Sequence, residues 1–302
     1  MRYFHFPLAI LHFSFVTAGV KAVTICAFPF ALLVGCQNAS KEPLRAEVAQ
    51  ARTDDWNAAV APQPSKRTSG KLIHVLVALC DNEYQGIVPV PARIGNGDDP
   101  ANNLYWGARF GVKTFFKRAS DWKLIAEARN PRAEILERLV FQHQSKDVYL
   151  VADAYRGREI KRCVADFFEF SAGRNRETIK ANSIELHAGG GADLVAYVGH
   201  DGLMDFSLDS YPQKADDRQR DAVMLACVSK RYFAEPLRKT GAKPLLWTTG
   251  LMAPEAYVLK AAIDGWVLNE DREGVRRRAA TAYNQHQRCG MNAALKLFST
   301  EW

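Results

Sequence analysis

Short, nearly continuous apolar segments recur along this chain and alternate with segments of helical spacing. The first apolar segment covers 72–79 (LIHVLVAL), and four more follow at 147–152, 192–198, 222–226 and 243–248. Strands that are apolar on both faces are typical of a sheet covered by helices on both sides. The pattern therefore predicts an α/β fold with a mostly parallel central sheet of about six strands.

The spacing between the apolar segments predicts the connecting elements. Helices are expected at 104–117, 133–144, 157–170, 232–240 and 254–267, with one or two more at 271–298, and a short strand at 122–125. The segment from 81 to about 103 is rich in glycine, proline and asparagine. It is too long for a plain connection, so we interpret it as a binding loop.

A glycine run, Gly189-Gly190-Gly191, interrupts the alternation just before the apolar segment 192–198. The run has no strand before it, no helix after it and no lysine, all of which a phosphate-binding loop needs. We therefore expect it to be a flexible connection, with His187 in a turn.

The N-terminal region is apolar over 3–35, and only Lys21 interrupts it. The two resulting runs are shorter than, or barely equal to, the roughly 18–20 residues that cross a bilayer. The second run has the layout of a secretory signal and ends in Leu33-Val34-Gly35-Cys36, which resembles the bacterial lipobox. This resemblance implies that Cys36 is lipidated. The alternative is a transmembrane anchor with an incidental cysteine.

The chain is thus expected to have three parts. These are a lipoprotein signal segment (1–36), a flexible polar tether (37–70) and an α/β domain (71–302). The expected location is the bacterial cell envelope, with the lipid anchor in the outer membrane or on the periplasmic face.

Charge and cysteine content limit the partners and cofactors. The chain has 40 Lys+Arg and 33 Asp+Glu, a net charge of +7. Its only basic triplet, Arg276-Arg277-Arg278, suits a solvated helix face, and no interleaved aromatic and basic motif points to nucleic acid. No CxxC spacing or His/Cys cluster is present, so neither a metal nor another cofactor is expected. An exported domain can form disulfides, but the sequence does not choose a pairing among Cys80, Cys163, Cys227 and Cys289.

Two reactive residue types follow two of the predicted strands. Segment 192–198 runs into Gly199-His200-Asp201-Gly202, and segment 222–226 runs into Cys227. Parallel strands deliver the residues after their carboxyl ends to one edge of the sheet. A thiol and an imidazole at that edge are the minimum for a cysteine nucleophile and its base. The helix expected after Cys227 would favour the thiolate.

This arrangement resembles the caspase–gingipain–separase superfamily of cysteine peptidases over roughly 72–268. In that family one apolar strand ends in His-Gly and a later one ends in Ala-Cys; the matching residues here are Gly199-His200 and Ala226-Cys227. The resemblance implies that His200 is the general base or acid and Cys227 the nucleophile. It also implies an oxyanion hole formed by the backbone N–H groups of Cys227 and Gly202. The chain departs from the family at Asp201, where the family has glycine.

The expected activity is therefore hydrolysis of peptide bonds through a thioester, with a peptide or protein as substrate. One alternative is a non-catalytic envelope lipoprotein that binds a protein or glycan with a degenerate domain of the same fold. Another is a doubly wound binding domain without cysteine chemistry. A buried thiol, or His and Cys side chains that point apart, would favour binding over catalysis.

Overall fold

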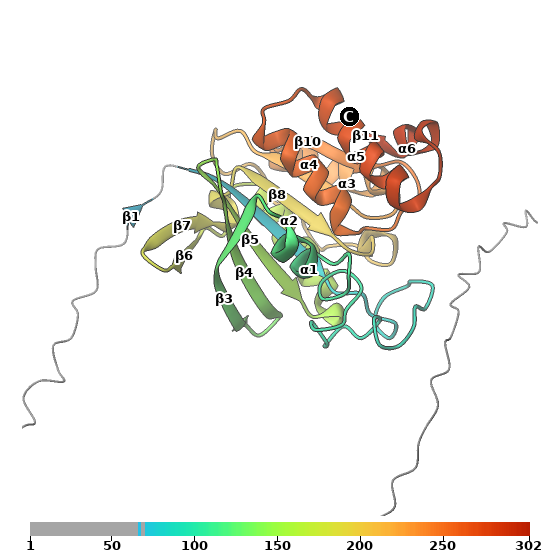
Figure 1. Cartoon of the computed structure of the whole chain (residues 1–302), viewed down its shortest axis with the longest axis horizontal. Helices are drawn as coiled ribbons and strands as arrows, with labels where there is room; N and C mark the ends of the chain where they lie inside the picture. Colours follow the sequence, from blue (N-terminus) through green and yellow to red (C-terminus); the bar gives the residue numbers. More distant parts are fainter. Residues whose placement is uncertain (1–65, 68–69) are drawn as a thin grey trace, which may run out of the picture. The chain divides into compact units, whose positions relative to one another are not determined.

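The computed structural model describes residues 66–67 and 70–302 (Figure 1). Cys36, the signal segment and all but 66, 67 and 70 of the expected tether lie outside the described residues. The described part has the expected α/β class, and its large sheet is mostly parallel. This sheet has eight strands, whereas the sequence indicated about six.

The central sheet is mixed, with a parallel middle and antiparallel edges. Its strands are β2 (Lys71–Ala78), β3 (Trp122–Arg132), β4 (Ile135–His143), β5 (Val148–Tyr155), β8 (Leu194–Val198), β9 (Asp221–Leu225), β10 (Lys243–Thr248) and β11 (Phe298–Ser299). They lie in the order β11-β10-β9-β8-β2-β5-β4-β3. The pairs from β10 to β5 are parallel, whereas β3, β4 and β11 pair antiparallel.

Helices cover both faces of the sheet. One face is packed against α1 (Val112–Arg118), α4 (Ala256–Val267), α5 (Arg272–Gln287) and α6 (Met291–Leu297), and the other against α2 (Ile160–Ser171) and α3 (Ser229–Thr240). Along β2, Val75 and Val77 belong to the first core and Leu76 and Ala78 to the second. Side chains alternate between faces along a strand, so two covered faces require a continuous apolar run. Among the described residues, no helix is long and apolar enough to cross a membrane.

A second, smaller sheet packs beside the central one, and its hairpin adds Ile179 and Leu186 to the core that also contains α2 (Figure 1). It consists of the hairpin β6 (Glu177–Ala181) and β7 (Ile184–Ala188), with β1 (Lys66–Arg67) paired in parallel to β7. Two residues of the expected tether therefore form a strand. His187 lies in β7 rather than in a turn, and Gly189–Gly191 is a buried 3-10 turn rather than a flexible connection.

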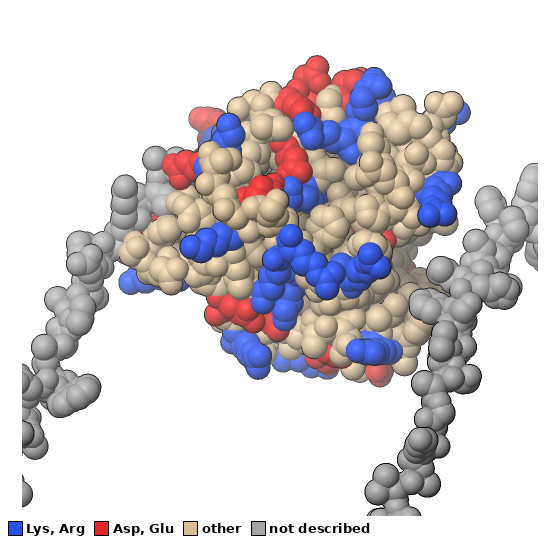
Figure 2. Space-filling view, viewed as in Figure 1, with Lys and Arg blue, Asp and Glu red and all other residues tan. Residues whose placement is uncertain are grey.

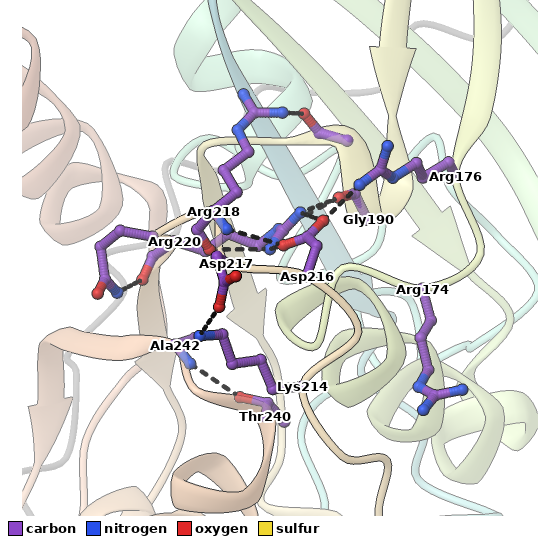
Figure 3. A network of polar contacts seen from close by, with 12 residues as sticks. Arg174, Arg176, Gly190, Lys214, Asp216, Asp217, Arg218, Arg220, Thr240 and Ala242 are labelled. Atoms are coloured by element: carbon purple, nitrogen blue, oxygen red, sulfur yellow. Dashed lines mark hydrogen bonds and ion pairs between the residues drawn. The ribbon is translucent and has the colours of Figure 1, made fainter.

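A polar network holds the glycine turn in place (Figure 3). The guanidinium of Arg220 is buried, donates to the carbonyl oxygen of Gly190 at 2.7 Å and pairs with Asp216 at 2.7 Å. Asp216 also pairs with Arg176, and the hydrogen bond from Arg220 is the main cause that lowers the pKa of Asp216. This network lies near the amino ends of β8 and β9. We interpret it as structural, because its basic groups are paired internally.

The helix expected at 133–144 is wrong, because this segment is β4. Two charged residues of this segment, Glu137 and Arg138, are buried. Glu137 accepts hydrogen bonds from the indole of Trp106 and from Lys113, both at 2.7 Å. Arg138 pairs with Asp153 at 2.6 Å. These partners come from distant segments, so tertiary contacts override the local pattern.

The helix expected at 104–117 is also shorter than predicted, since α1 begins only at Val112. A Cβ atom at Gly111 would lie 2.4 Å from the backbone of Trp106, so the chain turns tightly there before the helix starts. The strand expected at 122–125 is longer than predicted and continues to Arg132 as β3.

The surface carries charges of both signs (Figure 2). Lysine and arginine side chains form a band across the middle of the visible face, and acidic side chains gather above it. Many basic groups have an acidic neighbour, such as Lys117 with Glu127 at 2.9 Å and Arg278 with Glu270 at 2.5 Å. Such exposed pairs contribute up to about 1 kcal/mol each.

Candidate active site

His200 and Cys227 lie at the same edge of the central sheet. Strands β8 and β9 are neighbours and pair in parallel, with Val198 opposite Leu225. His200 and Cys227 each follow this paired position by two residues. Neighbouring strands are about 4.8 Å apart, so the two residues leave the sheet side by side. The yellow arrow of β8 points toward the end of the sheet from which the long loop after β2 projects (Figure 1).

A sharp turn connects Cys227 to α3. Val228 has φ 51° and ψ 28°, a left-handed conformation that is unusual for a β-branched residue. The hydroxyl of Ser229 donates to the carbonyl oxygen of Met224 at 2.9 Å, and its N–H donates to Oγ1 of Thr248 at 3.1 Å. These bonds fix the turn, so Cys227 is held at its tip, just before the N-terminus of α3.

The thiol of Cys227 is partly buried and contacts the backbone of Met252. The Met252 N–H donates to Sγ at 3.5 Å, and Sγ lies 3.6 Å from the Met252 carbonyl oxygen. Burial raises the pKa of the Cys227 thiol, and the nearby Asp201 raises it further, whereas the Met252 N–H lowers it. In the structure as it stands, the thiol is therefore not preset as a thiolate.

The remaining cysteines of the described part are also free thiols. Cys80 and Cys163 are buried, and burial raises the pKa of both, that of Cys80 to about 11. Cys289 is exposed. None of the pairings that the sequence left open is formed.

The imidazole of His200 is held by a carboxylate. Nε2 of His200 lies 2.7 Å from Oδ2 of Asp205, and the hydroxyl of Tyr197 donates to the His200 carbonyl oxygen at 2.6 Å. Asp205 directly follows the 3-10 turn Gly202–Met204, which brings its side chain back to the histidine. This role of Asp205 was not predicted from the sequence, because it depends on the path of the turn.

The long loop after β2 also reaches Asp205. The N–H of Gly86 donates to Oδ2 of Asp205 at 3.1 Å. A Cβ atom at Gly86 would lie 2.6 Å from Oδ1 of the same carboxylate, so any larger residue would have to displace the Asp205 side chain. The loop that we interpreted as a binding loop thus contacts the group that holds His200.

Asp201 has an unusual environment for a carboxylate. Its side chain is buried, Oδ1 accepts the Leu203 N–H at 3.1 Å, and Oδ2 has no hydrogen-bond partner in the described part of the chain. Burial is the main cause that raises the pKa of Asp201 to about 7, the Leu203 N–H lowers it, and the charge of Asp205 adds to the rise. Near neutral pH, an ionisable group therefore lies close to Cys227.

The two expected oxyanion donors differ in availability. The N–H of Gly202 donates to the His200 carbonyl oxygen at 3.0 Å, so it is already engaged. For the Cys227 N–H, the described residues provide no hydrogen-bond acceptor. The Cys227 amide is thus the donor that could receive a developing oxyanion.

The structure brings His200 and Cys227 to neighbouring strand ends but shows no hydrogen bond between them among the described residues. In free enzymes, catalytic hydrogen bonds are often long and tighten only when substrate binds. Because Nε2 of His200 is bound to Asp205, Nδ1 is the nitrogen left for the thiol.

Other polar residues that could be considered for a site have structural partners. His286 stacks on Tyr257 with ring centroids 3.9 Å apart. Arg93 donates to Asn102 at 3.0 Å within the long loop, and Asp98 pairs with Arg156 at 2.6 Å. Within residues 70–302, no group of three or more His, Cys, Asp and Glu side chains is arranged to hold a metal ion.

No protein-family model, no curated protein and no solved structure matches this chain. The candidate site therefore rests on the geometry of the chain itself.

Proposed function

We propose that this domain is a cysteine hydrolase that cleaves peptide bonds, with Cys227 as nucleophile, His200 as base and Asp205 as the group that orients His200. One observation carries the proposal: His200 and Cys227 follow register-paired positions on neighbouring parallel strands, and a carboxylate holds the far nitrogen of the imidazole. A nucleophile, a base and an orienting third group form the usual set for such catalysis.

In the proposed reaction, Nδ1 of His200 takes the proton of the Cys227 thiol while Sγ attacks the carbonyl carbon of the peptide. The oxyanion forms beside the free N–H of Cys227. The imidazolium then gives its proton to the leaving amine, and a thioester to Cys227 remains. Water, deprotonated by His200, hydrolyses the thioester and restores the thiol. Asp205 stabilises the imidazolium that forms in each half of the reaction.

The backbone around Cys227 supports this role. A β-branched residue in the left-handed region costs on the order of 1–2 kcal/mol, and such strain is concentrated at functional sites. Val228 carries this strain, and the surrounding bonds of Ser229 and Thr248 maintain it. The N-terminus of α3 follows immediately and favours negative charge at Cys227.

The resemblance to the caspase–gingipain–separase superfamily extends the proposal. Its strand-end histidine and later strand-end cysteine correspond to the order of His200 and Cys227, so we propose a caspase-like domain. We also propose that the chain is an exported lipoprotein anchored through Cys36. That proposal rests on residues 33–36 of the sequence.

A labelling experiment tests the dyad. The rate of iodoacetamide reaction at each cysteine is measured by mass spectrometry in the full chain at pH 7. Cys227 should react faster than the exposed Cys289, and His200→Ala should slow Cys227 alone. The substitution His286→Ala is the matched control, because His286 is an exposed histidine with a structural stacking role. Equal rates for Cys227 in all three proteins would refute the proposal.

A second candidate is a non-catalytic binding lipoprotein with the same fold. The specific observation in its favour is that the thiol of Cys227 binds the Met252 backbone and has a raised pKa. This candidate predicts slow labelling of Cys227, unchanged by His200→Ala, together with normal folding of both variants.

A further inference from the structure

Large exposed hydrophobic side chains are unevenly distributed over the described surface. Within residues 70–302 they are Tyr84, Val88, Met204, Leu251, Leu268 and Trp302. Single exposed apolar side chains are normal on a soluble protein, whereas a group of them around one feature indicates an interaction site. The first four lie in the loops that follow β2, β8 and β10. We refer to these four residues as the apolar rim.

Each member of the apolar rim is within two residues of a group that contacts the candidate site. Tyr84 and Val88 flank Gly86, whose N–H donates to Asp205. Met204 immediately precedes Asp205 in the chain. Leu251 precedes Met252, whose N–H donates to the Cys227 thiol at 3.5 Å. The rim residues therefore lie in the loops that follow the strands at the edge where His200 and Cys227 leave the sheet.

The loop that carries Tyr84 and Val88 is held in one shape. The side chain of Asn82 donates to the Val90 carbonyl oxygen at 2.8 Å and accepts the Val90 N–H at 3.0 Å, which closes the loop at its base. Gln85 is buried and donates to the carbonyl oxygens of Leu79 at 2.8 Å and Gly157 at 3.0 Å. Fixing the loop before binding reduces the entropy lost when a ligand covers it.

Two carboxylates of the loops at this edge, those of Asp205 and Asp81, are already engaged. Asp205 accepts from His200 and Gly86, and Asp81 accepts the N–H groups of Glu83 at 2.9 Å and Tyr84 at 3.3 Å. Apolar surface is consequently what the rim offers to a ligand, with Val88 87% and Leu251 74% exposed. We expect a substrate that reacts at Cys227 to contact this surface with the side chains next to its scissile bond.

We infer that the apolar rim selects polypeptide segments with large apolar side chains, such as leucine or phenylalanine, beside the bond presented to Cys227. This inference rests on the proposed function for its reaction. Peptide binding to the rim can be measured without any reaction. The apolar preference and the proposed peptidase activity can therefore be refuted independently.

The binding test uses the full chain with Cys227→Ala and short fluorescent peptides that differ in one central residue: Leu, Phe, Ala, Lys or Asp. Fluorescence polarisation should show at least about tenfold tighter binding of the Leu and Phe peptides than of the Lys and Asp peptides, as burial of one large side chain allows. Adding Leu251→Ser should weaken the Leu peptide about tenfold. Adding Leu268→Ser should change nothing, because Leu268 is 52% exposed at the far end of α4.

The outcomes separate the two ideas. Cleavage of the Leu and Phe peptides by the unmodified chain and not by Cys227→Ala supports both. Apolar binding without cleavage supports the inference and refutes the peptidase. Cleavage without apolar preference, equal binding of all peptides, or binding of none overturns the inference.

Binding of either of two other partners to the rim would also overturn the inference that it selects apolar peptides. A second copy of the chain would make Leu251→Ser, but not Leu268→Ser, reduce self-association in sedimentation experiments. A lipid surface would make the same variant lose binding to phosphatidylethanolamine–phosphatidylglycerol vesicles. Either result without an effect on peptide binding assigns the rim to that occupant instead.

Discussion

Oδ2 of Asp205 lies 2.7 Å from Nε2 of His200. This contact leaves Nδ1 as the nitrogen that can face Cys227, and it gives the imidazolium a carboxylate partner. Asp205 in turn is bound by the N–H of Gly86. The proposed base is therefore connected to the loop that carries part of the apolar rim, so substrate contacts and base orientation share one carboxylate.

The substitution Asp205→Asn should slow alkylation of Cys227 about tenfold at pH 7 and move the midpoint of the rate–pH profile upward by about one unit. The amide can still accept the Gly86 N–H, but it lacks the charge that stabilises the imidazolium, and one pKa unit corresponds to a tenfold change. Iodoacetamide kinetics between pH 5 and 9 measure both effects. An unchanged profile would show that Asp205 has a structural role only.

The substitution Gly86→Ala should displace the Asp205 carboxylate, because the added Cβ would lie 2.6 Å from Oδ1. We expect slower labelling of Cys227 with little change in melting temperature, since Gly86 is exposed. Gly250→Ala is the matched control: its Cβ would meet only the Leu297 side chain, at 3.4 Å. The two variants should therefore differ in thiol reactivity. If they behave alike, the close approach of Gly86 has no effect on the site.

The sequence was sufficient to predict the α/β class and the positions of the parallel strands. Each of these strands is buried on both faces, so its apolar run is continuous and independent of distant partners. Strand β4 could not be predicted in this way. The hydrogen-bond partners of its buried Glu137 and Arg138 lie on other elements. The residues of β4 alone therefore do not indicate that these two charged side chains are buried in a sheet.

Only part of the candidate site could be predicted from the sequence. His200 and Cys227 could be located because each follows a recognisable strand, and strand ends share an edge. The contact between Gly86 and Asp205 joins residues that are 119 positions apart. Its geometry depends on the path of a long irregular loop, which no periodicity encodes. The presence of a glycine in that loop could have indicated a close approach, but the loop contains several glycines and nothing in the sequence distinguishes Gly86 from the others.

The buried carboxylate of Asp153 should make the free energy of unfolding decrease at low pH. It is buried at β5, where burial opposes its charge, but Arg138 at 2.6 Å and His74 at 3.0 Å lower its pKa to about 2. A lowered pKa contributes stability that is present above the unfolded value of about 3.9 and is lost as pH falls toward 2. Asp153→Asn should remove the part of the acid dependence that Asp153 contributes.

Urea unfolding at pH 7 should show that Asp153→Asn costs about 3 kcal/mol, because it leaves the buried guanidinium of Arg138 with Glu177 as its remaining acidic partner. Asp217→Asn is the control, since its side chain is fully exposed and paired only with Lys214. It should leave the unfolding midpoint unchanged. Similar losses in the two variants would contradict a specific role for the buried network.

Lipidation of Cys36 can be measured directly. Protein extracted from membranes of a bacterial host should have Cys36 as its N-terminal residue, with a diacyl or triacyl addition in the intact mass. Cys36→Ser should abolish both the cleavage and the mass increase, because the thioether needs a thiol. Cys289→Ser, which removes an exposed thiol of the domain, should change neither. An uncleaved, unmodified N-terminus in the unaltered chain would refute the proposal.

Asp201 should couple both stability and thiol reactivity to pH near neutrality. Its pKa is raised from 3.8 to about 7, so the folded state holds the proton more tightly than the unfolded state between these values. Stability should therefore fall as pH rises from about 4 to 7, by at most about 4 kcal/mol for a shift of this size. Asp201→Asn keeps the oxygen that accepts the Leu203 N–H and removes the titration. Its stability should fall less than that of the unaltered chain across this window and exceed it at pH 8.

The same variant should make Cys227 more reactive above pH 7, because the ionised Asp201 carboxylate raises the pKa of the thiol. We expect the midpoint of Cys227 alkylation to move to lower pH in Asp201→Asn. Asp209→Asn removes a charge from a fully exposed side chain and should change neither stability nor labelling. A shift in stability without a shift in alkylation would mean that Asp201 is a buried structural group that does not act on the nucleophile. Both shifts together would show that Asp201 tunes the thiol.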